Sequence, residues 1–130
     1  MTARAKFQRL EVTAALALAA GLLACAGCYD SNSTDHKPPD GEGAIVVLNN
    51  TFTKVDVFVN GTEKGGVNSG NNRAFDMTSG VYRVALTELD GNRSYAGDVD
   101  VLVSQDTVLD VTADPFNTSK YDVAITFKSP

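Results

Sequence analysis

From Ala44 onward, apolar and polar residues alternate with a period of two, which is the pattern of half-buried β-strands. The segments with this pattern, or with a short continuous apolar run, are 44–48, 54–59, 73–77, 81–89, 95–103, 107–111 and 121–128. Asn60-Gly61 lies between 54–59 and the short charged segment 62–64, and this dipeptide is the strongest short signal for a tight hairpin. The pattern predicts an all-β domain, a small antiparallel β-sandwich of about seven or eight strands.

The alternation also predicts which side chains face the core and where the chain turns. The expected inward residues are Val55, Val57, Val59, Phe75, Met77, Tyr82, Val84, Leu86, Tyr95, Val99, Val101, Val103, Thr107, Leu109, Val111, Tyr121, Val123, Ile125 and Phe127. Turns or loops are expected at 65–70, 78–80, 90–92, 105–106 and 114–120, which are rich in glycine, asparagine, aspartate and serine. The polar alternate face of each strand indicates that one side of each sheet meets water.

The segment before the strands has a different pattern. A positively charged start is followed by the uncharged apolar run Ala14–Ala24, which is shorter than the ~20 residues that a transmembrane helix needs. This run has the length of the apolar region of a secretory signal peptide. It closes on Leu22-Leu23-Ala24-Cys25, which resembles the lipobox of bacterial lipoproteins. The resemblance implies cleavage before Cys25 and lipidation of its thiol and its new amino group.

Two alternatives to this interpretation stay open. Cys28 follows the small pair Ala26-Gly27 and is the alternative lipidation site, and an ordinary signal peptide without a lipid would give a secreted or periplasmic protein. In the sorting rule of enteric lipoproteins, Ala26 after the cysteine indicates the outer membrane. The spacing of the two cysteines also allows a redox or zinc pair, but no second pair or ligand set accompanies them.

The residues from Tyr29 to Gly43 are polar and rich in proline and glycine, which predicts a flexible tether. The expected organisation is therefore a signal peptide at 1–24, a lipidated cysteine and disordered tether at 25–43, and a β-sandwich domain at 44–130. His36 is the one histidine of the sequence. Because a catalytic or metal-binding histidine needs a rigid setting, we expect His36 to be solvated on the tether.

The charge of the chain limits its partners. The whole sequence has a net charge of −5, and removal of residues 1–24 takes away three basic residues and one acidic residue, which leaves −7. An acidic surface repels phosphate backbones, so we expect no nucleic-acid partner. It also gives no attraction to anionic lipids, so attachment to the membrane has to come from acyl chains on the N-terminal cysteine.

The segment Val55-Asp56-Val57-Phe58-Val59-Asn60-Gly61 resembles the opening of PEGA-type domains and of a related uncharacterised family of extracytoplasmic modules. Gly80-Val81-Tyr82-Arg83-Val84 matches a later strand of the same families. The resemblance covers roughly residues 44–112. It implies a non-catalytic Ig-like or prealbumin-like module in the cell envelope.

The candidate chemistry is weak. The histidine of a hydrolytic triad would have to come from the tether, so we expect no catalytic residue, no enzyme activity and no cofactor. Asp98 and Asp100 share a strand face, and Asp110 would join them if the next strand paired alongside, which makes these three the weak candidates for a Ca²⁺ site. Tyr95 and Tyr121 are candidate sugar-stacking groups, although their inward register favours core packing.

The function that the sequence predicts is therefore that of a membrane-anchored envelope lipoprotein that presents a β-sandwich to a protein partner. The alternative is a cell-surface module that binds carbohydrate or Ca²⁺. The N-x-[ST] triplets at Asn49, Asn60, Asn92 and Asn117 indicate turn-rich composition in a bacterial protein and candidate glycan sites in a eukaryotic one.

Overall fold

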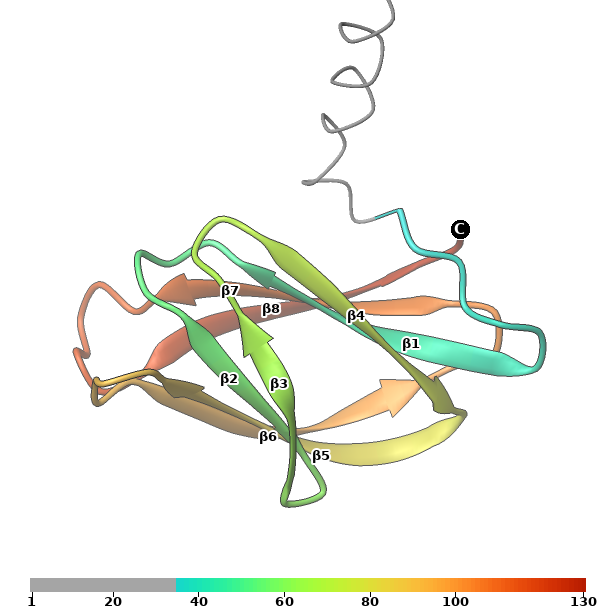
Figure 1. Cartoon of the computed structure of the whole chain (residues 1–130), viewed down its shortest axis with the longest axis horizontal. Coiled ribbons are helices and arrows are strands. Elements are labelled where there is room, and N and C mark those ends of the chain that lie inside the picture. The colour runs from blue at the N-terminus through green and yellow to red at the C-terminus, as the bar shows by residue number, and fades with distance from the viewer. Residues whose placement is uncertain (1–34) are drawn as a thin grey trace, which may run out of the picture. The chain divides into compact units, whose positions relative to one another are not determined.

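The structure is a computed structural model and describes residues 35–130, which form eight strands in two stacked sheets (Figure 1). The strands are β1 (Glu42–Asn49), β2 (Val55–Val59), β3 (Thr62–Val67), β4 (Asn72–Thr78), β5 (Gly80–Glu88), β6 (Ser94–Val101), β7 (Asp106–Ala113) and β8 (Tyr121–Lys128). One sheet has the order β4-β1-β7-β8, and the other has the order β3-β2-β5-β6. The predicted all-β sandwich of seven or eight strands is confirmed.

The first sheet is built around β1, whose residues Gly43–Val47 are all buried. A continuous apolar run suits this central position, because β1 has a neighbour on each side, β4 on one and β7 on the other. The β1–β7 pairing is parallel, whereas every other strand pairing is antiparallel as predicted. Between β1 and β7 the chain builds the whole second sheet, so a local sequence pattern carries no sign of this pairing.

The second sheet starts from the predicted hairpin. Asn60 and Gly61 have φ angles of 50° and 81°, and only residues that tolerate positive φ can form this two-residue turn. The return strand β3 is longer than the sequence predicts, because it continues through Gly65 and Gly66 to the buried Val67. The register shifts between Val57 and Phe58, so Lys64 has no opposite residue and forms a bulge, while Gly65 and Gly66 pair with Val57 and Asp56 instead of forming a loop.

The core lies between the two sheets and is filled by the inward residues of both. Its buried members are Ile45, Val47, Val55, Val57, Val59, Val67, Val84, Leu86, Val99, Val101, Leu109, Val111 and Tyr121, with Phe75, Met77, Tyr82, Tyr95 and Val123 partly buried against them. Most of the predicted inward residues are therefore confirmed. Three are exposed instead: Val103, Ile125 and Phe127 have 50%, 38% and 50% of their surface accessible.

The turn between β6 and β7 lies earlier than predicted. β6 ends at Val101 and Ser104 takes a φ of 59°, so Val103 belongs to the turn and faces solvent. Asp106, which the sequence places in the turn, begins β7 and has no exposed surface. Neither of its carboxylate oxygens accepts a hydrogen bond among residues 35–130. Burial raises the pKa of Asp106, and the His36 ring and backbone oppose this increase only in part.

The described end of the predicted tether lies against the first sheet. Asp76, Ala44, Asp106 and Lys128 form one row across this sheet. At its two ends, Nε2 of His36 lies 2.5 Å from Oδ1 of Asp76, and Lys128 bonds the carboxylate of Asp35. His36 is thus half-buried and paired, whereas the sequence predicts it to be solvated. Pro38 is buried and β1 already begins at Glu42, so residues 36–43 belong to the domain.

Candidate interaction surface at the loop end of the sandwich

Four loops gather at one end of the sandwich, and we call this end the loop end. It consists of residues 50–54, 68–71, 89–93 and 114–120. Backbone hydrogen bonds tie these loops to each other and to the strand ends: the N–H of Leu89 donates to Lys54, that of Asn50 to Val111 and that of Asn49 to Asn71. Residues 35–41 and the C terminus lie at the opposite end (Figure 1). The eight residues of β1 separate the two ends by about 26 Å.

Three large apolar residues project from the loop end. Phe52 and Phe116 are 99% and 98% exposed, and Leu89 is 45% exposed. Phe52 lies in the loop after β1, Leu89 in the loop after β5 and Phe116 in the loop after β7. Two phenylalanines with this exposure contribute almost nothing to the core.

The loop that carries Phe52 is held by a buried asparagine. Asn49 has no exposed surface, and its Nδ2 donates to the carbonyls of Thr53 at 2.8 Å and Val67 at 2.9 Å. Its Oδ1 accepts hydrogen bonds from the backbone N–H and the hydroxyl of Thr51, at 2.9 and 2.6 Å. This one side chain fixes the turn on both sides of Phe52, so the ring projects from an ordered loop.

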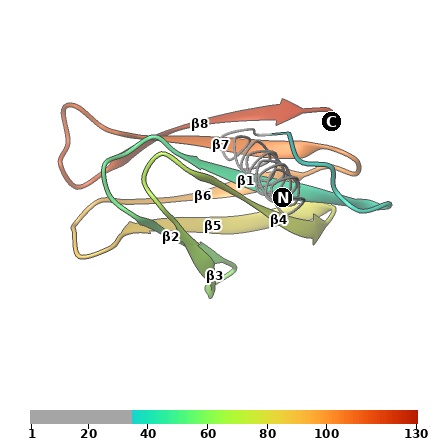
Figure 2. The same cartoon turned by 45° about the horizontal axis from the view of Figure 1, so that its top comes forward.

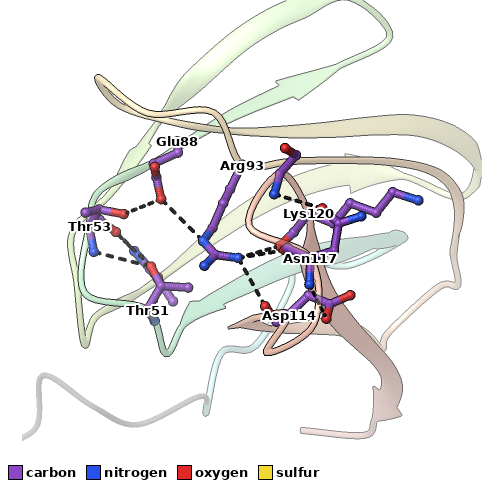
Figure 3. Close-up of polar contacts among 9 residues, drawn as sticks. Thr51, Thr53, Glu88, Arg93, Asp114, Asn117 and Lys120 are labelled. Carbon is purple, nitrogen blue, oxygen red and sulfur yellow. Dashed lines mark hydrogen bonds and ion pairs between the residues drawn. The ribbon is translucent and has the colours of Figure 1, made fainter.

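The loop that carries Phe116 is held by Arg93 (Figure 3). Its Nη1 donates to the backbone carbonyls of Asp114, Asn117 and Lys120, at 3.3, 3.0 and 3.0 Å. The carboxylate of Asp114 in turn accepts the backbone N–H of Phe116 at 2.8 Å. Both aromatic loops are therefore pre-organised, which lowers the entropy that binding would cost.

A short polar chain links the two loops in Figure 3. Thr53 donates its hydroxyl to Glu88 at 3.1 Å, and Glu88 forms a half-buried ion pair with Arg93 at 3.9 Å. Burial, reinforced by the nearby Glu88 carboxylate, raises the pKa of Tyr121 to about 12. Tyr121 is thus a neutral core residue at any physiological pH.

The candidate Ca²⁺ ligands are not brought together. Asp98 and Asp100 lie on β6 in one sheet, whereas Asp110 lies on β7 in the other, so the strand pairing that would have brought Asp110 beside them does not occur. Asp98 pairs with Arg83 at 3.3 Å, and Asp110 accepts a hydrogen bond from Asn50 at 2.7 Å. Within residues 35–130, no group of three or more histidine, cysteine or acidic side chains is arranged to hold a metal ion.

The two candidate sugar-stacking tyrosines do lie close together. They line an open pocket of about 310 Å³ where β6 and the start of β8 meet, together with Ser94, Ala96, Ser119 and Lys120. Tyr121 is only 5% exposed and Tyr95 is half-buried, in agreement with the expected core packing. Tyr95 is therefore the aromatic side chain that a ligand in this pocket would meet.

The remaining sequence predictions concern isolated positions. Cys25 and Cys28 lie outside the described residues. Asn49 is fully buried and its amide is engaged, which excludes it as a glycan site, whereas Asn60, Asn92 and Asn117 are exposed. In the part of the chain that the structure describes, no helix has the length and apolar character to cross a membrane.

Comparison with known proteins adds little. No protein-family model and no curated protein matches the chain. Among solved structures, the chain is similar to the N-terminal domain of AlgF from P. aeruginosa, with 19% identity and a TM-score of 0.47. The likeness covers 67% of this chain and 95% of that one, and at this level it carries no argument about function.

Proposed function

We propose that the chain is a non-catalytic lipoprotein of the bacterial cell envelope, anchored through Cys25, which presents its sandwich to a protein partner. The apolar leader and the lipobox-like residues 22–25 support the anchor, and Ala26 favours the outer membrane. The resemblance to PEGA-type modules supports a binding role rather than an enzymatic one.

The observation that carries the proposal is the exposure of Phe52 and Phe116 at the loop end, opposite the end where residues 35–42 enter the fold. A domain tethered at its entry end would hold these rings away from the anchor. Aromatic side chains dominate protein interfaces when they fill pockets on a partner. Full burial of two phenylalanines is worth about 3–6 kcal/mol, enough to decide whether a complex forms.

The anchor is tested by replacing Cys25 with alanine and separating membranes from the other fractions. We expect the variant to leave the membrane fraction, while the control Cys28→Ala stays there. If only Cys28→Ala is released, the lipid is on Cys28. If both variants stay in the membrane, the lipid anchor is wrong.

The interaction surface is tested by native gel electrophoresis of envelope extracts in mild detergent. We expect a complex larger than the free chain, and we expect Phe52→Ser with Phe116→Ser to weaken it at least about 100-fold. Val81→Ser is the matched control, because Val81 is 65% exposed but lies at the start of β5, away from the loop end. Equal loss in the control, or no loss in the double variant, would contradict the proposal.

A second candidate function is the binding of a carbohydrate at the pocket beside Tyr95, which is favoured by the two serine hydroxyls and Lys120 around its opening. Binding on a glycan array that is lost in Tyr95→Ala would support it. Absence of binding to any glycan would count against it.

A further inference from the structure

The four edge strands of the two sheets are not equally protected against pairing with another chain. Natural edge strands are protected by charged residues, bulges or shortness. Charges lie near the middle of three of them: Glu63 and Lys64 on β3, Arg73 and Asp76 on β4, and Asp98 and Asp100 on β6. In β8 the five central residues, Val123–Phe127, carry no charge, glycine or proline. β8 is thus the edge most open to a new strand.

The outer side of β8 has no backbone partner within the described residues. Among the described residues β8 pairs only with β7, and the one isolated backbone bridge toward the other sheet runs from Lys120, just before the strand, to Ser94. Figure 2 shows β8 along the margin of the molecule. The free N–H and C=O groups of an edge strand form a ready template for pairing.

The inner face of β8 is also incompletely covered. Tyr121 is buried near the bridge to β6, whereas Ile125 and Phe127, farther along the same face, are 38% and 50% exposed. The alternation predicts four inward residues on this strand and is correct in direction, but the opposite sheet does not cover the last two, Ile125 and Phe127. Their exposure leaves an apolar strip beside an unpaired backbone.

The sequence of β8 is complementary to itself. In an antiparallel pairing centred on Ile125, each Asp122 faces Lys128 of the other copy, and each Val123 faces Phe127. Opposite charges and apolar pairs in directly opposed positions stabilise antiparallel strands. This register pairs odd-numbered residues with odd-numbered residues. The N–H and C=O groups of these residues point away from β7, so those of one copy face those of the other.

We infer that β8 is a self-association edge, at which two copies of the chain pair antiparallel around a twofold axis at Ile125 and form one continuous eight-stranded sheet. A second copy is favoured over an unrelated strand because the acidic and basic ends of β8 are spaced to match each other. The ammonium group of Lys128 also bonds Asp35 within one copy, and its three donors allow it to serve both carboxylates. This contact goes beyond the proposed function, since it uses neither the anchor nor the loop end.

Disulfide trapping tests the pairing and its register. Both natural cysteines are replaced by serine in the full chain, and single cysteines are introduced on β8. We expect Ile125→Cys to give a disulfide-linked dimer under mild oxidation, because the two residues at the twofold axis have Cα atoms about 4.5–5.5 Å apart. Val123→Cys is the matched control on the same face. Its two copies would lie about 13 Å apart, beyond the reach of a disulfide.

Two further variants test the pairing itself. Val123→Cys combined with Phe127→Cys should restore the crosslink. Asp122→Lys in the Ile125→Cys chain places like charges opposite each other, so it should lower the dimer yield at limiting concentration about tenfold. Addition of Lys128→Asp to this chain should restore the yield. A thermal melt shows whether each variant is folded.

Each remaining outcome would overturn the inference. Equal dimer yields from Val123→Cys and Ile125→Cys would show that the disulfides form by random collision. A folded Ile125→Cys chain that stays monomeric excludes the pairing. A crosslink from position 125 to a different protein assigns the edge to another partner.

Discussion

Asn49 offers the sharpest test of how the loop end is held together, because one buried side chain makes four hydrogen bonds there. Replacement with alanine removes all four and leaves the carbonyls of Thr53 and Val67 without these donors. At about 1 kcal/mol net for each bond, we expect Asn49→Ala to lower the free energy of unfolding by about 3–4 kcal/mol. That is a large part of the ~5–15 kcal/mol available to a small domain.

The measurement is urea unfolding of the full chain followed by circular dichroism, supported by a thermal melt. For a domain of this size, a loss of about 3 kcal/mol lowers the melting temperature by about 12–24 °C. The matched control is Asn50→Ala, because Asn50 is exposed and makes one hydrogen bond to Asp110 at 2.7 Å. It should change stability by less than about 0.5 kcal/mol. Similar losses in both variants would refute the assignment of the network to Asn49.

Three further predictions concern single positions. Arg93→Ala should destabilise the fold by about 2 kcal/mol and speed amide exchange in the loop between β7 and β8, whereas Arg83→Ala, which breaks one exposed ion pair, should cost less than about 1 kcal/mol. Because its pKa is raised in the folded state, Asp106 favours folding only below the unfolded pKa of about 4, and this contribution is lost at higher pH. The free energy of unfolding of Asp106→Asn should therefore rise relative to that of the natural chain between pH 4 and pH 7. A difference in free energy that stays constant across this range, measured by urea unfolding, would contradict the burial of a charged group. Gly43→Ala should lower the melting temperature by several degrees, because a Cβ at Gly43 would overlap the carbonyl oxygen of Leu102; an unchanged melt would show that the turn can move aside.

The sequence predicts much of this fold, because a strand with one buried face repeats every two residues. Val55, Val57 and Val59 on β2, and Val84 and Leu86 on β5, are buried as the alternation predicts. The Asn60-Gly61 turn follows from backbone chemistry alone. These features depend on neighbours in the chain, which a local pattern records.

Several of the incorrect predictions have one physical origin, since they depend on which strands become neighbours. Asp98 and Asp110 lie in different sheets, although their strands follow each other in the chain. Ile125 and Phe127 are exposed because β8 is an edge strand whose end the other sheet does not cover. Asp106 has the composition of a turn residue, but it begins β7 and lies fully buried in a row of the first sheet, between Ala44 and Lys128.

The candidate site was largely beyond sequence reasoning. Phe52 and Phe116 lie 64 positions apart in separate loops, and nothing in the local pattern indicates that the two loops share an end of the sandwich. Asn49 and Arg93 appear in the sequence as ordinary turn residues. The usable signals were Phe52, which lies between the predicted strands 44–48 and 54–59, and Phe116, which lies within the predicted loop 114–120.

Mass spectrometry of the native protein, purified from its own envelope, tests the central proposal most directly. The proposal predicts a chain that begins at Cys25 and carries the added mass of acyl chains on that residue. A chain that begins at Met1, or a processed chain without acyl mass on Cys25 or Cys28, would contradict it.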